Sequence, residues 1–146
     1  MRTGRGIALA AALLGTAAVA QAEDGAALYE THCAACHNTG GTGTPGLAPP
    51  LDRPDFWSAL GEHAPSFISG VITKGFNMKI IVRGEQYMGT MMPPVMGATD
   101  AELASIATWV VGTLGQTGQT VSAEEIAAAR GAMTNDALKA LRPASE

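Results

Sequence analysis

The sequence predicts an all-α fold, and two helix-start signals carry that prediction. Glu102 follows Thr99 by three residues, and Glu125 follows Ser122 by the same distance. In each pair the hydroxyl and the carboxylate can accept hydrogen bonds from each other's backbone N–H, which is the capping box that opens many helices. The one extended stretch typical of a strand, 80–83, is too isolated to imply a sheet.

The best-marked helix runs from Thr99 to Leu114. Its apolar residues recur on one face at helical spacing, at Leu103, Ile106, Ala107, Val110 and Leu114. A second helix is predicted to start at Ser122 and to run through Ala129. Gly131 is expected to interrupt it. Residues 137–141 would add a last turn or two.

Weaker signals mark the earlier part of the chain. Asp24 to about Cys33 is predicted to be a short helix, and the glycine- and proline-rich stretch 39–51 a loop. An apolar cluster indicates one helical turn over 56–60. Pro65 suits the first turn of a further helix, and Gly75 suits its end.

The first 22 residues are typical of a cleaved secretory signal. Arg2 and Arg5 supply a positive start, residues 7–20 are mostly apolar, and Ala22 ends a small-residue cleavage site. The apolar run is shorter than the roughly 20 residues that a membrane-spanning helix needs. We therefore expect an exported, soluble, periplasmic protein without a membrane span, with an uncleaved N-terminal anchor as the alternative.

Composition excludes one class of partner and favours a cofactor. The nine Lys and Arg of the chain include Arg2 and Arg5, so residues 23–146 keep seven, against 13 Asp and Glu, for a formal charge of −6. That balance argues against nucleic acid, whose phosphates attract cationic proteins. Bulky apolar residues are sparse, so a large apolar cofactor would complete an otherwise thin core.

Residues 33–37 read Cys-Ala-Ala-Cys-His, the C-x-x-C-H pattern of covalent haem c attachment. Cys33 and Cys36 can each add to one vinyl group of the same porphyrin, and His37 can then reach the iron. A disulfide, a thioredoxin-like redox pair and a zinc site are the alternatives. A thioredoxin-like site would need βαβ units and a zinc site further ligands, and the sequence has neither.

Four further segments accompany this motif, and their order and separation along the chain are informative. They are 25–29, 46–51, 87–94 and the helix 99–114 with Trp109. Together with the haem motif they resemble a class I monohaem cytochrome c, and are most similar to domains that serve periplasmic dehydrogenases and some terminal oxidases. The resemblance covers roughly Gly25 to Gly115. It implies a class I cytochrome c fold, in which three to five helices wrap around one covalent haem c.

We therefore expect three parts: a cleaved signal peptide over 1–22, a haem domain over 23–115 and a C-terminal helical extension over 116–146. The resemblance also implies two contacts. The helix that begins at Asp24 is expected to cross the helix 99–114, with Gly25 and Tyr29 packed against Ile106 and Trp109. The Pro49 carbonyl is expected to accept a hydrogen bond from the ring N–H of His37.

The sixth iron ligand is expected among four methionines, Met88, Met91, Met92 and Met96. A thioether raises the reduction potential relative to a second histidine. Met92 directly precedes a proline, as the family ligand does, and this biases its backbone towards an extended conformation. The usual spacing from the family tyrosine would select Met91, so Met92 is the first choice and Met91 the second.

Some polar side chains are candidates to pair with the haem propionates, although the sequence gives no geometry for them. These candidates are Trp57, Lys79, Arg83 and Tyr87.

With both axial positions filled, the predicted function is single-electron transfer and not catalysis. The expected partners are redox proteins, namely a dehydrogenase as donor and an oxidase or cytochrome as acceptor. The alternatives are a haem ligand sensor or peroxidase with a labile sixth site, and a dedicated cytochrome subunit of a dehydrogenase complex.

Overall fold

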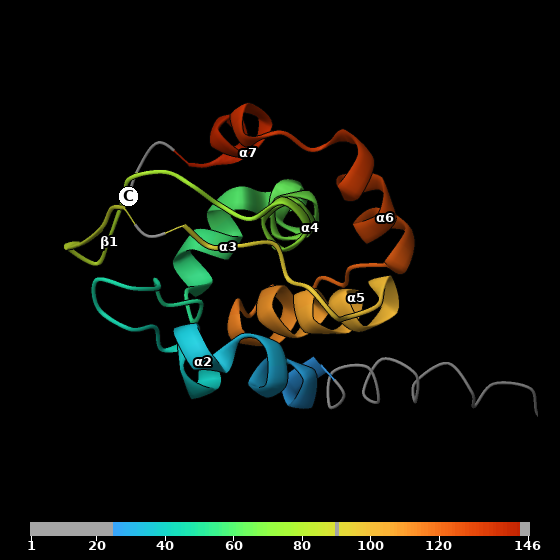
Figure 1. Ribbon diagram of the computed structural model, residues 1–146, viewed down its shortest axis with the longest axis horizontal. Coiled ribbons are helices and arrows are strands. Elements are labelled where there is room, and N and C mark those ends of the chain that lie inside the picture. Colours follow the sequence, from blue (N-terminus) through green and yellow to red (C-terminus); the bar gives the residue numbers. More distant parts are fainter. Residues whose placement is uncertain (1–24, 90, 144–146) are drawn as a thin grey trace, which may run out of the picture.

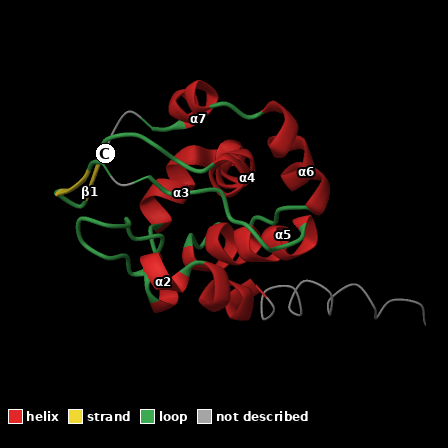
Figure 2. Ribbon diagram, viewed as in Figure 1, coloured by secondary structure: helices red, strands yellow, loops and turns green. Residues whose placement is uncertain are grey.

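Helices make up most of the secondary structure, as the all-α prediction requires (Figure 2). The structure, a computed structural model, describes residues 25–89 and 91–143, so the predicted signal peptide lies outside the described residues. Residues 25–32 are helical. The α-helices after them are α2 (Ala34–His37), α3 (Pro54–Leu60), α4 (Ala64–Lys74), α5 (Asp100–Thr108), α6 (Ala123–Ala132) and α7 (Asn135–Leu141).

The remaining helical elements are short and of other types. They are the 3₁₀ turns η1 (Thr39–Gly41) and η2 (Gly61–His63), and the π-helical η3 (Trp109–Leu114). The predicted fold class is therefore confirmed, with more short helices than the three to five expected. Within the described ranges, none of the helices is long and apolar enough to cross a membrane.

Both predicted capping boxes are present. The backbone N–H of Thr99 donates to the Glu102 carboxylate over 2.7 Å, and the Glu102 N–H donates to the Thr99 hydroxyl over 3.2 Å. Ser122 and Glu125 repeat the arrangement at the start of α6. The predicted break at Gly131 is wrong, because α6 continues through this glycine to Ala132.

The helical segment 25–32 crosses α5 and the start of η3 at a point of close backbone approach. A Cβ on Gly25 would clash with the Ser105 carbonyl oxygen and lie 2.9 Å from the Trp109 Cβ, so only glycine fits there. Next to this crossing the Tyr29 and Trp109 rings pack together, with 4.7 Å between their centroids and their planes tilted by 45°. The predicted crossing is confirmed, and it holds the segment that leads into the haem motif against α5.

The extended stretch at 80–83 was expected to be too isolated for a sheet, and this expectation is wrong, because the structure contains a small two-stranded sheet. Strands β1 (Ile80–Val82) and β2 (Glu85–Tyr87) pair antiparallel, with Ile81 opposite Gln86. The two turn residues, Arg83 and Gly84, both have positive φ, at 50° and 81°. Such a two-residue turn matches the twist of a hairpin.

The described part of the C-terminal extension packs on the protein's own core. Figure 1 shows α7 on the side of α4 opposite residues 25–32, and α6 beside α4 and α5. Gly70 of α4 allows the close contact, because a Cβ there would lie 2.7 Å from the Leu138 side chain. Arg130 of α6 also donates to Asp100 at the start of α5 over 2.8 Å.

Replacing Leu138 with alanine is expected to lower the free energy of unfolding by about 2–5 kcal/mol, because its side chain is fully buried and would leave a cavity. Urea denaturation of the haem-loaded protein, followed by circular dichroism, measures this loss. Lys139→Ala is the matched control on the same helix, since Lys139 is exposed, and we expect a change within about 0.5 kcal/mol. Equal effects of the two substitutions would show that α7 does not stabilise the core.

Candidate functional site

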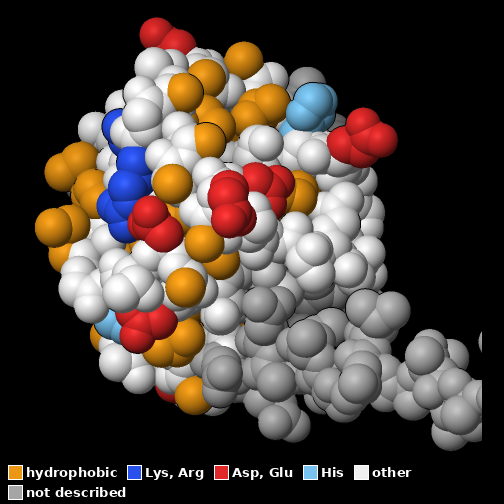
Figure 3. Space-filling model, turned by 90° about the vertical axis from the view of Figure 1, so that its right-hand side faces the viewer, with side chains coloured by type: hydrophobic (Ala, Val, Ile, Leu, Met, Phe, Trp, Pro, Cys, Tyr) orange, Lys and Arg blue, Asp and Glu red, His pale blue; other side chains and the backbone are white. Residues whose placement is uncertain are grey.

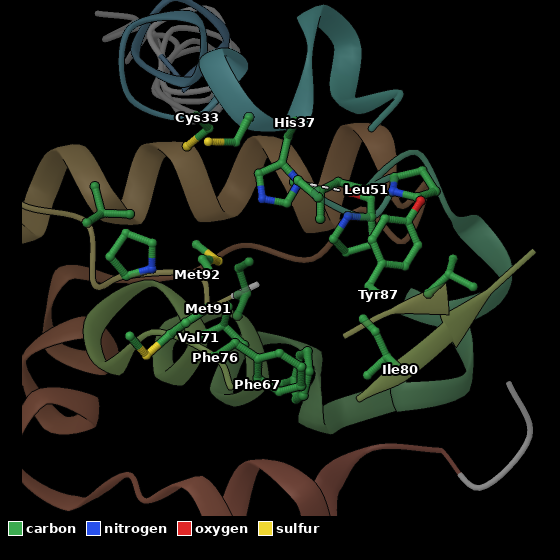
Figure 4. Close-up of a pocket in the computed structure, with 18 of the residues that line it drawn as sticks. Cys33, His37, Leu51, Phe67, Val71, Phe76, Ile80, Tyr87, Met91 and Met92 are labelled. Atoms are coloured by element: carbon green, nitrogen blue, oxygen red, sulfur yellow. Dashed lines mark hydrogen bonds between the residues drawn. The ribbon is translucent and has the colours of Figure 1, made fainter. Parts of the chain in front are cut away.

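A cavity of about 310 Å³ opens between the segment that carries Cys33 and His37, helix α4 and the hairpin. Figure 4 shows Cys33 and His37 entering from one side, while Phe67, Val71 and Phe76 lie on the other. Apolar side chains from α3, α4, both strands and the connecting loops form most of the wall. They include Leu51, Phe56, Trp57, Phe67, Ile68, Val71, Phe76, Ile80, Val82 and Tyr87.

His37 is 6% exposed and its ring has a defined tautomer. Its Nδ1 lies 2.9 Å from the Pro49 carbonyl oxygen. Because a carbonyl oxygen only accepts, Nδ1 carries the hydrogen, and Nε2 keeps its lone pair. Burial lowers the pKa of His37, and the bond to Pro49 acts in the opposite direction. The neutral imidazole that results is the form that binds metals.

The loop after the motif folds back onto His37 through backbone hydrogen bonds. The N–H of Gly43 donates to the His37 carbonyl over 2.8 Å, and the N–H of Leu51 donates to the Gly41 carbonyl over 2.7 Å. The Asn38 side chain adds a bond to the Gly43 carbonyl. These contacts fix the predicted loop 39–51, and they bring the Pro49 carbonyl to the ring.

Cys33 and Cys36 are free thiols that both line the cavity, so the structure does not contain the alternative disulfide. Cys33 directly precedes α2 and Cys36 lies within it, and this spacing lets both side chains reach the cavity. Cys33 is partly buried and Cys36 is exposed. Burial, and then the neighbouring Cys36, raise the pKa of Cys33 to about 11.

The four candidate methionines differ in how they meet the cavity. Met88, Met91 and Met96 are 59%, 66% and 78% exposed, whereas Met92 is partly buried and packs against the core. Met88 is not among the residues that line the cavity. The Met92 side chain lies between the His37 ring and the α4 side of the cavity (Figure 4).

Met92 is also the methionine whose backbone is fixed. It forms an antiparallel bridge with Phe76, with N–H to carbonyl distances of 2.9 and 3.0 Å in the two directions. Three residues later the Val95 N–H donates to the Ile72 carbonyl over 2.8 Å. Both bonds attach the loop to α4 and the residues just after it.

Comparison with known proteins decides the family. Residues 22–113 match the family described as Cytochrome c, which is more than half of the chain. This chain belongs to the cytochrome c family. It is 36% identical over 94 residues to "Cytochrome c-552" of Thermus thermophilus. That match covers 64% of this cytochrome and 62% of the relative, so this cytochrome spans less than two thirds of the relative it matches.

Membership of the family implies one covalently bound haem c, and the cavity of this cytochrome fits that group. Its walls are mostly apolar, as a porphyrin requires. Its polar donors include two thiols, one neutral imidazole and a thioether, which are the groups that attach haem c and bind its iron.

The predicted propionate partners differ in whether they line the cavity. Trp57 and Tyr87 line the cavity, but the Trp57 ring N–H donates to the Leu51 carbonyl over 2.8 Å. Arg83 is exposed and bonds Asp52. Lys79 is exposed and is not among the lining residues.

Sequence reasoning missed both arginines that line the cavity, Arg53 and Arg142. No local pattern marked Arg142, because it directly follows α7 with an extended backbone and reaches the cavity only through the packing of that helix.

Proposed function

We propose that this cytochrome is a periplasmic single-electron carrier. In the proposal Cys33 and Cys36 would hold the porphyrin through thioether bonds, and His37 and Met92 would bind the iron. The observation that carries it is the placement of the His37 ring and the Met92 side chain in one apolar cavity. Met91 remains the second choice, because it lines the same cavity with a largely exposed side chain.

Haem c, when bound, supplies a one-electron Fe(III)/Fe(II) couple. The residues of this chain orient the ligands and exclude water. The Pro49 carbonyl holds the His37 ring in one orientation and makes its imidazole a better donor. The thioether of Met92 favours the reduced iron. The apolar walls from α4 and the hairpin keep the site dry, so few groups need to reorient when the charge of the iron changes.

The negative charge of this cytochrome favours a redox partner with a basic docking surface. Residues 23–146 carry a formal charge of −6, so long-range attraction favours a positively charged patch. The face in Figure 3 shows acidic side chains at several separate places and basic ones gathered together. We propose a dehydrogenase as electron donor and an oxidase or another cytochrome as acceptor, with association that slows as salt is raised.

Absorption spectra of the haem-loaded protein, oxidised and reduced, test this proposal. We expect a low-spin c-type spectrum in the reduced protein and the far-red thioether-to-iron band in the oxidised protein. Carbon monoxide added to the reduced protein should bind slowly and incompletely, because Met92 fills the sixth position. Fast and complete binding, with no far-red band, would overturn the proposal and favour a ligand sensor or peroxidase.

A further inference from the structure

Two guanidinium groups of the cavity lining contact one aromatic ring. The Arg53 Cζ is 4.8 Å from the centre of the Phe56 ring, and the Arg142 Cζ is 5.3 Å from the same centre. Arg142 also lies 5.7 Å from the Phe76 ring centre. Both arginines line the cavity. Because the rings hold the cations by their faces, the guanidinium groups stay at the cavity wall.

The two arginines reach this point from distant parts of the sequence. Arg53 directly precedes α3 and is 7% exposed. Arg142 directly follows α7, and its backbone is extended, which turns the chain away from the helix. The burial of Leu138 against α4 holds α7 in place. The C-terminal extension therefore contributes a charged residue to the wall of the haem cavity.

Electrostatics favours an anion beside this pair. Burial, and then the positive charge of Arg53, lower the pKa of Arg142 to about 10, so Arg142 stays charged at neutral pH and lies close enough to Arg53 to interact with it. Arg53 contacts the exposed Asp55 carboxylate at 3.3 Å. A further carboxylate between the two guanidinium groups would reduce their mutual repulsion. Arginine also binds a carboxylate with two parallel N–H donors.

Haem carries such carboxylates on its two propionate side chains. We propose that Arg142, together with Arg53, binds a propionate of the haem, so that the C-terminal extension completes the haem site. This inference rests on the proposed placement of the haem in the cavity. In this arrangement the extension acts on the iron through charge, because a cation beside the porphyrin favours Fe(II) over Fe(III).

Reduction potentials of haem-loaded variants test the inference. We expect Arg142→Gln to shift the potential downwards, and Arg142→Lys, which keeps the charge, to recover most of the parent value. Arg130→Gln is the matched control, since it makes the same charge change in the same extension at a residue that bonds Asp100 and is not among the cavity residues. The Arg142→Gln shift should be roughly threefold larger or more, because a partly buried charge is screened less.

Arg142→Met provides a second charge-removing variant, which keeps an apolar stem against Phe56 and Phe76 if the glutamine variant fails to mature. An unchanged potential in either variant, or a shift equal to that of Arg130→Gln, would overturn the inference. The far-red band of the parent protein separates this failure from failure of the proposed function. If the parent shows the band and the variants keep the parent's potential, only the role of Arg142 is wrong.

Discussion

Replacing Cys33 and Cys36 together with alanine is expected to give a protein from which acid acetone extracts all of the haem. Both thiols line the cavity three positions apart, and no thioether bond can form without them. The haem would then be held only by ligand and apolar contacts, which acid and organic solvent break. The measurement is the haem absorbance in the solvent and in the precipitated protein.

The parent protein and the single substitution Cys36→Ala are the controls for this extraction. The parent should keep its pigment in the precipitate, and the Cys36→Ala protein should keep a fraction through the bond to Cys33. Release of the whole pigment from the parent, with two free thiols left behind, would contradict covalent attachment at this motif.

Replacing Met92 with alanine is expected to abolish the far-red band and to lower the reduction potential by on the order of 0.1 V, within the roughly 0.8 V range that axial ligands span. The loss of the thioether removes the ligand that favours Fe(II). It also opens the sixth position, so carbon monoxide should bind the reduced variant quickly and completely. Redox titration and the two absorption spectra measure these changes.

Met91→Ala is the matched control, because it removes the same side chain from the adjacent position. Its side chain is 66% exposed, so we expect the parent's far-red band, potential and carbon monoxide response. If Met91→Ala loses the band and Met92→Ala keeps it, the two methionines exchange roles. That outcome would support the spacing from the tyrosine over the position before the proline.

Most features that could be predicted from the sequence depend on neighbouring residues. The capping boxes at Thr99 and Ser122 each act within one helical turn, so their residue types and spacing were sufficient. The same holds for the haem motif at 33–37, where covalent chemistry requires a fixed spacing. The crossing at Gly25 is a long-range contact, and it was predicted because the family resemblance supplied the partner helix.

The features that could not be predicted depend on residues far apart or on weak local preferences. Glu85 and Gln86 have little strand propensity, and the positive φ of Arg83 is unusual for that residue type, so the hairpin had no clear signal. Arg142 reaches the cavity only because α7 packs on α4. Its position depends on the tertiary fold, which the local sequence pattern does not contain.

The backbone bridge between Phe76 and Met92 has a consequence for ligand exchange at the iron. The bridge and the bond from Val95 to Ile72 attach the loop on both sides of the proline pair. Under the proposed ligation, a thioether that dissociates stays tethered within a short distance of the metal. Its effective concentration is then in the millimolar range or above, as for other short tethers. The Met92 thioether would therefore bind the iron again before a dissolved ligand at micromolar concentration could take its place.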